Sequence, residues 1–181
     1  GAALAAAFGL RAMGPGAVAA AEPGTPVVWL QAQCCTGCSV SLLNSITGGT
    51  AEDLLRSAVD LRYHPTLMAS AGPNAVAAAR AAKDAGGYVL VVEGAVPTGA
   101  QGTYCYLWPG TTAEAGVREY ASRAAQIVAV GTCAAYGGIP ASVPAGGVNP
   151  TGARGVSQLV EGRAVINVPG CPPHPDWIVG T

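Results

Sequence analysis

Four of the six cysteines come shortly after strand-like apolar runs, and this placement limits what the chain can fold into. The runs span residues 27–30, 127–130 and 164–168, and the cysteines that follow them are Cys35, Cys38, Cys133 and Cys171. Parallel strands end at the same edge of a sheet, so we expect the turns after these runs to converge. Four thiolates that meet at one point are typical of an iron–sulfur cluster.

The whole chain alternates short β-branched runs with helix-like segments, which predicts a doubly wound α/β domain with a parallel sheet. Strands are expected at residues 27–31, 61–64, 88–93, 126–131 and 163–168, and helices at 39–46, 53–59, 74–85 and 113–124. The Gly- and Pro-rich stretch 137–155 is predicted to be a surface loop. After Cys171 a Pro-rich turn leads into the start of another helix. In this fold, a cluster held by the four cysteines would lie at the C-terminal edge of the strands.

The composition favours a subunit that hides much of its surface. Only 10% of the 181 residues are charged and 50% are hydrophobic, whereas about a quarter of an ordinary soluble domain is charged. Burial of apolar surface against a partner explains this balance, and an Ala-rich, high-GC genome is the alternative explanation. The net charge is −1 and no basic run is present, which argues against nucleic acid and acidic membrane surfaces as partners.

Residues 1–21 differ from the rest and are interpreted as the remnant of an export signal. Arg11 is their only charge, and they end in small residues before Glu22, as at a signal cleavage site. The basic start of such a signal is missing, and a flexible Ala-rich helix is the alternative. Arg11 and Gly14-Pro15-Gly16 interrupt the apolar stretch, so no membrane span is expected. The mature domain is therefore expected at 22–181.

The spacing of the cysteines alone leaves three chemistries open. Six cysteines in an exported protein suggest disulfides or a redox dithiol. The pair Cys35 and Cys38 has the Cys-x-x-Cys spacing that begins many zinc sites, but those usually close with a second such pair, which this sequence lacks. Glycines beside the cysteines favour an iron–sulfur cluster, because they let the backbone approach the inorganic core and offer N–H groups to sulfide.

Four segments of the chain resemble the small subunit of nickel–iron hydrogenases of the periplasmic uptake type. They are Trp29-Leu30-Gln31 followed by Cys35-Thr36-Gly37-Cys38, then Glu93-Gly94-Ala95-Val96-Pro97, then 131–138 around Cys133, and 167–177 around Cys171. The segments keep the family's order and span almost all of residues 22–181. The resemblance implies a flavodoxin-like domain in which Cys35, Cys38, Cys133 and Cys171 ligate a proximal [4Fe-4S] cluster.

The resemblance also implies a division of labour with a large subunit in a heterodimer. The nickel–iron centre that splits dihydrogen belongs to that partner, so no catalytic residue is expected in this chain. The resemblance implies that the chain relays electrons from that centre through the proximal cluster during H2 oxidation or evolution. Full-length members carry two further clusters in a C-terminal domain, whose ligands we do not find in these 181 residues. A periplasmic location reached by twin-arginine export is expected for this type.

Residues beside the ligands are expected to contact the cluster. Thr36 and Thr132 would do so through their hydroxyls and Gly37 through its backbone, although turn formation explains the two threonines as well. Cys34 directly precedes the first ligand, and the tandem pair is similar to that of the cluster subunit of respiratory complex I. The Thr-Gly-Cys that follows favours the hydrogenase spacing. Cys34 is then a bystander that can hydrogen-bond sulfide or, under oxidation, join the cluster.

Four other residues carry weaker expectations. Cys105 lacks a glycine-rich turn and is predicted to be a buried apolar side chain. Glu93 ends an apolar strand, where a carboxylate is costly unless paired; an interface or proton-path role and a salt-bridged strand end both fit. His174 lies between prolines and fits a hydrogen-bond donor to the cluster or a turn residue. His64 lies on a separate segment from His174, so no second set of metal ligands is predicted.

Two rival functions stay open. One is a cluster-carrying subunit of a quinone-linked complex, and the other is a zinc-stabilised binding domain. Metal analysis separates the second from the iron–sulfur interpretation, because it finds either iron with acid-labile sulfide or zinc.

Overall fold

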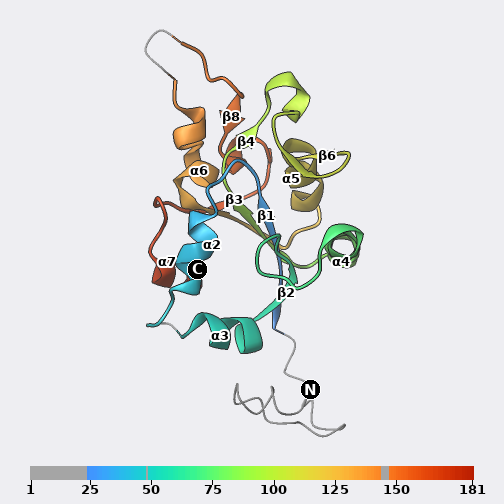
Figure 1. The fold of residues 1–181 in the computed structure, drawn as a ribbon, viewed down its shortest axis with the longest axis vertical. Helices are drawn as coiled ribbons and strands as arrows, with labels where there is room; N and C mark the ends of the chain where they lie inside the picture. Colours follow the sequence, from blue (N-terminus) through green and yellow to red (C-terminus); the bar gives the residue numbers. More distant parts are fainter. Residues whose placement is uncertain (1–23, 48, 144–146) are drawn as a thin grey trace, which may run out of the picture.

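A five-stranded parallel sheet forms the centre of the computed structural model, which describes residues 24–47, 49–143 and 147–181 (Figure 1). The strand order is β2-β1-β3-β7-β9. The bounds are Thr25–Gln31 for β1, Val59–Tyr63 for β2, Val89–Glu93 for β3, Gln126–Val130 for β7 and Ile166–Val168 for β9. This order is the flavodoxin-like one, so the predicted doubly wound sheet is confirmed. The predicted export-signal remnant, residues 1–21, lies outside the described residues.

Helices and short turns connect the strands. The helices are α2 (Gly37–Leu43), α3 (Ala51–Asp53), α4 (Gly72–Ala85), α5 (Ala113–Ala121), α6 (Gly131–Tyr136) and α7 (Pro175–Val179). A π-helical turn, Leu54–Ala58, follows α3, and 3-10 turns occupy Gly99–Gly102, Ile139–Ala141 and Val156–Gln158. Two small antiparallel pairs join β4 (Val96–Pro97) to β8 (Ala153–Arg154) and β5 (Tyr106–Trp108) to β6 (Thr111–Thr112). No helix within the described ranges has both the length and the apolar composition that crossing a bilayer requires.

Each face of the sheet buries its own apolar cluster, because successive side chains of a strand point to opposite faces. In Figure 1, α4 and α5 lie on one side of the sheet and α2 and α7 on the other. The first cluster joins Val28, Leu30, Leu90, Val92, Ile127 and Ala129 of the sheet to Ala79 of α4 and to Val117 and Tyr120 of α5. The second joins Val27, Trp29, Val91 and Val130 to Leu42, with Ile178 and Val179 of α7 packed against it.

Several sequence predictions need correction; the helix expected at 39–46, for example, ends at Leu43. The stretch 137–155 is not a loop throughout, because it contains a 3-10 turn and the strand β8. The helix expected at 113–124 ends at Ala121, since the N–H of Arg123 turns back to the carbonyl of Tyr120. The strand expected at 163–168 begins only at Ile166. Strands of two or three residues are too short to show a regular alternation of apolar and polar residues in the sequence.

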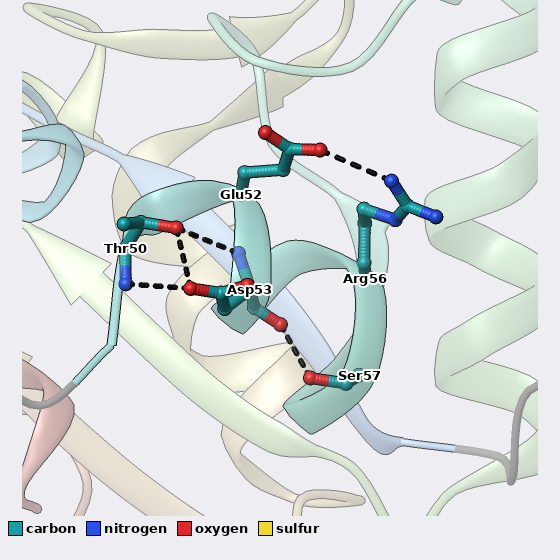
Figure 2. A network of polar contacts seen from close by, with 5 residues as sticks. All are labelled: Thr50, Glu52, Asp53, Arg56 and Ser57. Atoms are coloured by element: carbon teal, nitrogen blue, oxygen red, sulfur yellow. Dashed lines mark hydrogen bonds and ion pairs between the residues drawn. The ribbon is translucent and has the colours of Figure 1, made fainter.

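The start of α3 is fixed by a capping box, which Figure 2 shows. Thr50 Oγ1 accepts a hydrogen bond from the N–H of Asp53 at 3.1 Å, and the Asp53 carboxylate accepts from the N–H of Thr50 at 3.1 Å. The hydrogen bond from the Thr50 hydroxyl lowers the pKa of Asp53 below its usual value. An ion pair between Glu52 and Arg56 at 3.0 Å continues the network on the exposed side.

We expect Leu90→Ala to lower the free energy of unfolding by about 2–5 kcal/mol, because it leaves a cavity in the first apolar cluster. Leu90 is 0% exposed in the central strand β3. The control is Ile46→Ala, a side chain that is 81% exposed, for which a change within about 0.5 kcal/mol is expected. Denaturant unfolding of both variants measures the difference, and equal effects would contradict the burial assigned to Leu90.

Candidate functional site

One cavity lies at the C-terminal edge of the sheet. The pairing register aligns Gln31 with Glu93, Glu93 with Val130 and Val130 with Val168, so four strands end in one row. The loops after this row enclose a cavity of about 70 Å³. It is lined by Cys34, Cys35, Gly37, Cys38, Glu93, Gly94, Gly131, Thr132, Cys133, Gly170, Cys171 and Pro172. The structure therefore brings the four candidate ligands together, and their ligation of a cluster stays a prediction.

The loop after β1 presents Cys35 and Cys38 at the cavity. Thr36 adopts a left-handed conformation, with φ of 64°, and its carbonyl accepts the N–H of Val40 at 3.0 Å in the first turn of α2. This sharp turn directs the chain into the helix, and only residues 32–36 separate β1 from α2. Cys35 is exposed and Cys38 is half-buried at the start of α2.

Two hydrogen bonds join the loops that carry Cys133 and Cys171. The N–H of Thr132 donates to the carbonyl of Gly170 at 2.8 Å, and the N–H of Gly170 donates to Thr132 Oγ1 at 3.1 Å. The Thr132 hydroxyl thus accepts a bond from a neighbouring loop in addition to lining the cavity. Because the two loops are clamped together, the spacing of their cysteines is set by the backbone.

Glycines make room for the sulfur atoms. A Cβ at Gly131 would lie 2.5 Å from Cys38 Sγ, and one at Gly138 would lie 2.7 Å from Cys133 Sγ. Both distances are shorter than real Cβ contacts, and both glycines have positive φ values. A Cβ at Gly37 would lie 3.1 Å from Cys35 Sγ. The cavity is therefore a cradle that any larger side chain at these positions would fill.

The residues around the cavity can be tested for the kind of metal group that they fit. Within the described part of the chain, no three His, Cys, Asp or Glu side chains converge closely enough to hold one metal ion. All six cysteines are described, and none forms a disulfide with another. The donor set, five cysteines around one cavity with glycine backbone beside them, fits an iron–sulfur cluster better than a zinc ion.

The environment of the cavity opposes free thiolates. Burial raises the pKa of Cys38 to about 12, and the negative charge of Glu93 adds to the effect. Burial also raises the pKa of Cys34 and of Cys133. These thiols are therefore protonated at neutral pH in the structure, and a metal group that bound through Cys38 and Cys133 would displace their protons.

Glu93 occupies the wall between the sheet and the cavity and is 1% exposed. The salt-bridged strand end that the sequence allowed is wrong for the described residues, since none of their ion pairs includes Glu93. Its carboxylate instead accepts hydrogen bonds, among them the Trp29 indole N–H at 3.1 Å and the Cys38 backbone N–H at 3.0 Å. A role at an interface or in a proton path stays a prediction.

His64 is the functional candidate that the sequence reasoning missed. It follows β2, is 0% exposed, and its Nε2 lies 3.1 Å from Ser39 Oγ. Its Nδ1 accepts the backbone N–H groups of Thr66 at 3.1 Å and Leu67 at 3.2 Å. Nδ1 is therefore unprotonated, and Nε2 carries the proton. The sequence feature that could have identified His64 was its position at the end of the predicted strand 61–64.

The remaining candidates lie as follows. Cys34 lines the cavity beside Cys35, whereas Cys105 lies away from it, half-buried against the first apolar cluster. Burial raises the pKa of the Cys105 thiol, as expected for an apolar packing role. His174 caps α7, because its Nδ1 accepts the N–H of Asp176 at 3.3 Å. The structural role considered for His174 is thus observed.

Comparison with known proteins identifies relatives for most of the chain. A family model described as "NADH ubiquinone oxidoreductase, 20 Kd subunit" matches residues 35–181. The periplasmic nickel–iron–selenium hydrogenase small subunit of Desulfomicrobium baculatum is 45% identical over 187 residues, covering 92% of this chain and 57% of that relative. The hydrogenase-2 small chain of Escherichia coli K12 is 42% identical, covering 86% of this chain and 41% of that relative.

A solved structure has the same fold. In the recombinant nickel–iron–selenium hydrogenase from Desulfovibrio vulgaris Hildenborough, one chain superposes with a TM-score of 0.81 at 43% identity. The match covers 88% of this chain and 58% of that one. The chain thus spans about half the length of the curated relatives, and the flavodoxin-like prediction agrees with their structure.

The neutral state of His64 predicts a pH dependence of stability. Burial lowers its pKa to about 4 in the folded chain, against 6.5 in the unfolded chain. The unfolded chain binds the proton first, so stability is fully present above pH ~6.5 and is lost as the pH falls toward ~4, by roughly 3 kcal/mol. We expect His64→Gln, which keeps an N–H donor for Ser39, to flatten this part of the profile. Denaturant unfolding between pH ~4 and ~6.5 measures the profile, and the same loss of stability in His64→Gln would contradict the assignment.

Proposed function

Because the chain belongs to the family of the NADH ubiquinone oxidoreductase 20 Kd subunit, and within it is a homologue of the small subunits of nickel–iron and nickel–iron–selenium hydrogenases, we propose that it is the electron-transfer subunit of such a hydrogenase. The observation that carries this proposal is the cavity at the sheet edge, where five cysteines and a glycine cradle meet. A bound [4Fe-4S] cluster would accept and release single electrons there during H2 oxidation or evolution.

The residues of the cavity have distinct parts in this proposal. Cys35, Cys38, Cys133 and Cys171 supply the four thiolates. Thr36 gives the turn that separates the first two ligands, and Gly37 leaves space beside Cys35 Sγ. Thr132 holds the loop of Cys171 through its two hydrogen bonds to Gly170. No residue of this chain is assigned a catalytic step.

The surface around the cavity supports a large-subunit partner that holds the nickel–iron centre. Cys35 and Cys171 are exposed there. Exposed apolar side chains lie on α2, α6, α7 and the turn after α6: Val40, Leu43, Tyr136, Ile139 and Trp177. Residues at or just before the start of each of these three helices line the cavity, and exposed apolar side chains near it support a protein interface there. Only 10% of the residues are charged, which agrees with an extensive buried contact.

The location and the extent of the domain belong to the same proposal. The relatives from Desulfomicrobium baculatum and Nitratidesulfovibrio vulgaris are named as periplasmic. Together with the signal-like residues 1–21, they support export to the periplasm, with the twin-arginine route as the proposed path and 22–181 as the cluster domain.

The tandem pair Cys34 and Cys35 favours a second candidate, the cluster subunit of a quinone-linked complex. Cys34 lines the cavity, so a register that uses both members of the pair is sterically available. Against it, Cys38 also lines the cavity at the start of α2, and identity with hydrogenase small subunits reaches 45%. The variants below separate the two registers.

We expect Cys133→Ser to abolish the cluster or to leave a three-iron form, because one of four thiolates is lost. Cys105→Ser is the matched control, since this thiol lies outside the cavity, and it should keep a full cluster. Cys34→Gly should also keep the cluster. Iron and sulfide analysis with EPR spectroscopy checks these results. A normal cluster in Cys133→Ser, or loss of the cluster in Cys34→Gly with Cys35→Ser tolerated, would contradict the ligand assignment.

The isolated chain should show no hydrogen uptake, and the complex with its large subunit should reduce an artificial dye with H2. The reason is that the proposal assigns the nickel–iron centre to the large subunit and gives this chain only the electron-relay cluster. The interface should bury more than ~2,000 Å², the range of obligate contacts. Dye-reduction assays on the chain and on the reconstituted pair make the measurement. Hydrogen uptake by the chain alone would refute the electron-relay assignment.

A further inference from the structure

The carboxylate of Glu93 is surrounded by hydrogen-bond donors alone. Its Oε1 accepts the backbone N–H groups of Cys38 at 3.0 Å and Ser39 at 3.3 Å. Its Oε2 accepts the indole N–H of Trp29 and the amide N–H of Gln31, both at 3.1 Å, and the hydroxyl of Ser39. Five donors on two oxygens leave no acceptor for a carboxyl proton, so this is the geometry of an ionised carboxylate.

Further hydrogen bonds orient the donor groups toward the Glu93 carboxylate. His64 Nδ1 accepts two backbone N–H groups, so His64 Nε2 donates to Ser39 Oγ. The Gln31 amide also donates to Ser39 Oγ, at 3.0 Å, so both lone pairs of this hydroxyl are used and its hydrogen is donated to Glu93. The amide of Gln31 is oriented by Thr66, whose hydroxyl donates to its oxygen at 3.2 Å. The charge on Glu93 is therefore stabilised by fixed dipoles, in the absence of a cationic partner among the described ion pairs.

This buried charge lies against the cavity. Glu93 lines the cavity together with the five cysteines, and it holds the backbone of the ligand Cys38 directly. A charge in the interior acts through a low effective dielectric constant and is screened little by salt. Since the reduction potential of an iron–sulfur cluster depends on the net charge and hydrogen bonding around it, a fixed negative charge here opposes the addition of an electron.

We propose that Glu93 is a positioning residue of the cluster site: its ionised carboxylate fixes the backbone at Cys38 and lowers the reduction potential of the cluster bound in the cavity. The inference rests on the proposed electron-transfer function. Trp29, Gln31, Ser39 and His64 support the carboxylate through the hydrogen bonds described above.

The test uses the assembled complex of this chain with its large subunit and follows the cluster by EPR during a redox titration. In Glu93→Gln the midpoint potential should rise, so that at the wild-type midpoint the ratio of reduced to oxidised cluster increases on the order of tenfold. The rise should persist in high salt, because the charge is buried. Glu161→Gln removes the same charge from an exposed turn before β9, at the opposite edge of the sheet, and should leave the potential unchanged.

Trp29→Phe is the second variant and carries the test if Glu93→Gln does not assemble. It keeps the carboxylate and removes one N–H dipole that neutralises it, so the midpoint potential should fall. If Glu93 had only a structural role, both variants would have lower thermal stability, and their midpoint potentials would not shift in opposite directions. An unchanged potential in Glu93→Gln, or an unchanged or raised one in Trp29→Phe, overturns the inference alone. A wild-type complex that contains no iron and sulfide overturns the proposed function and the inference together.

Discussion

The parallel hydrogen-bonded pairing of β1, β3, β7 and β9 is the interaction on which the site depends. Its register places Gln31, Glu93, Val130 and Val168 in one row, so the next residues of all four strands leave the sheet at the same level. A slip of one residue would turn the side chains of a strand to the opposite face. The register of the sheet therefore determines both the apolar packing and the positions of the cysteines.

The sheet and the convergence of the cysteines could be predicted from the sequence because both depend on local patterns. Apolar runs identify buried parallel strands, and each of the four candidate ligands is in or beside a glycine-containing turn that follows such a run. The strands β4 and β8 could not be predicted, because a pair of two-residue strands forms only where the fold brings Val96 opposite Arg154. The resemblance to hydrogenase small subunits was carried by the same turns that form the cavity.

The surroundings of Glu93 could not be predicted for a different reason. Its donors Trp29, Gln31, Cys38 and Ser39 lie 54 to 64 positions away in the sequence, and no local pattern reports such pairs. The sequence indicated only that a carboxylate at the end of an apolar strand must be compensated. The structure shows that dipoles, rather than a cation, compensate it, and that His64 sets their direction.

The strand β1 also sets the distance between Thr25 and the cavity. It runs from Thr25 at the far edge of the sheet to Gln31 at the edge of the cavity. Seven residues of extended chain at ~3.3 Å each span roughly 20 Å. A fluorophore or affinity tag attached at Thr25 would therefore lie about one strand length from the edge of the cavity, and would leave the surface around Cys35 and Cys171 free to bind a partner.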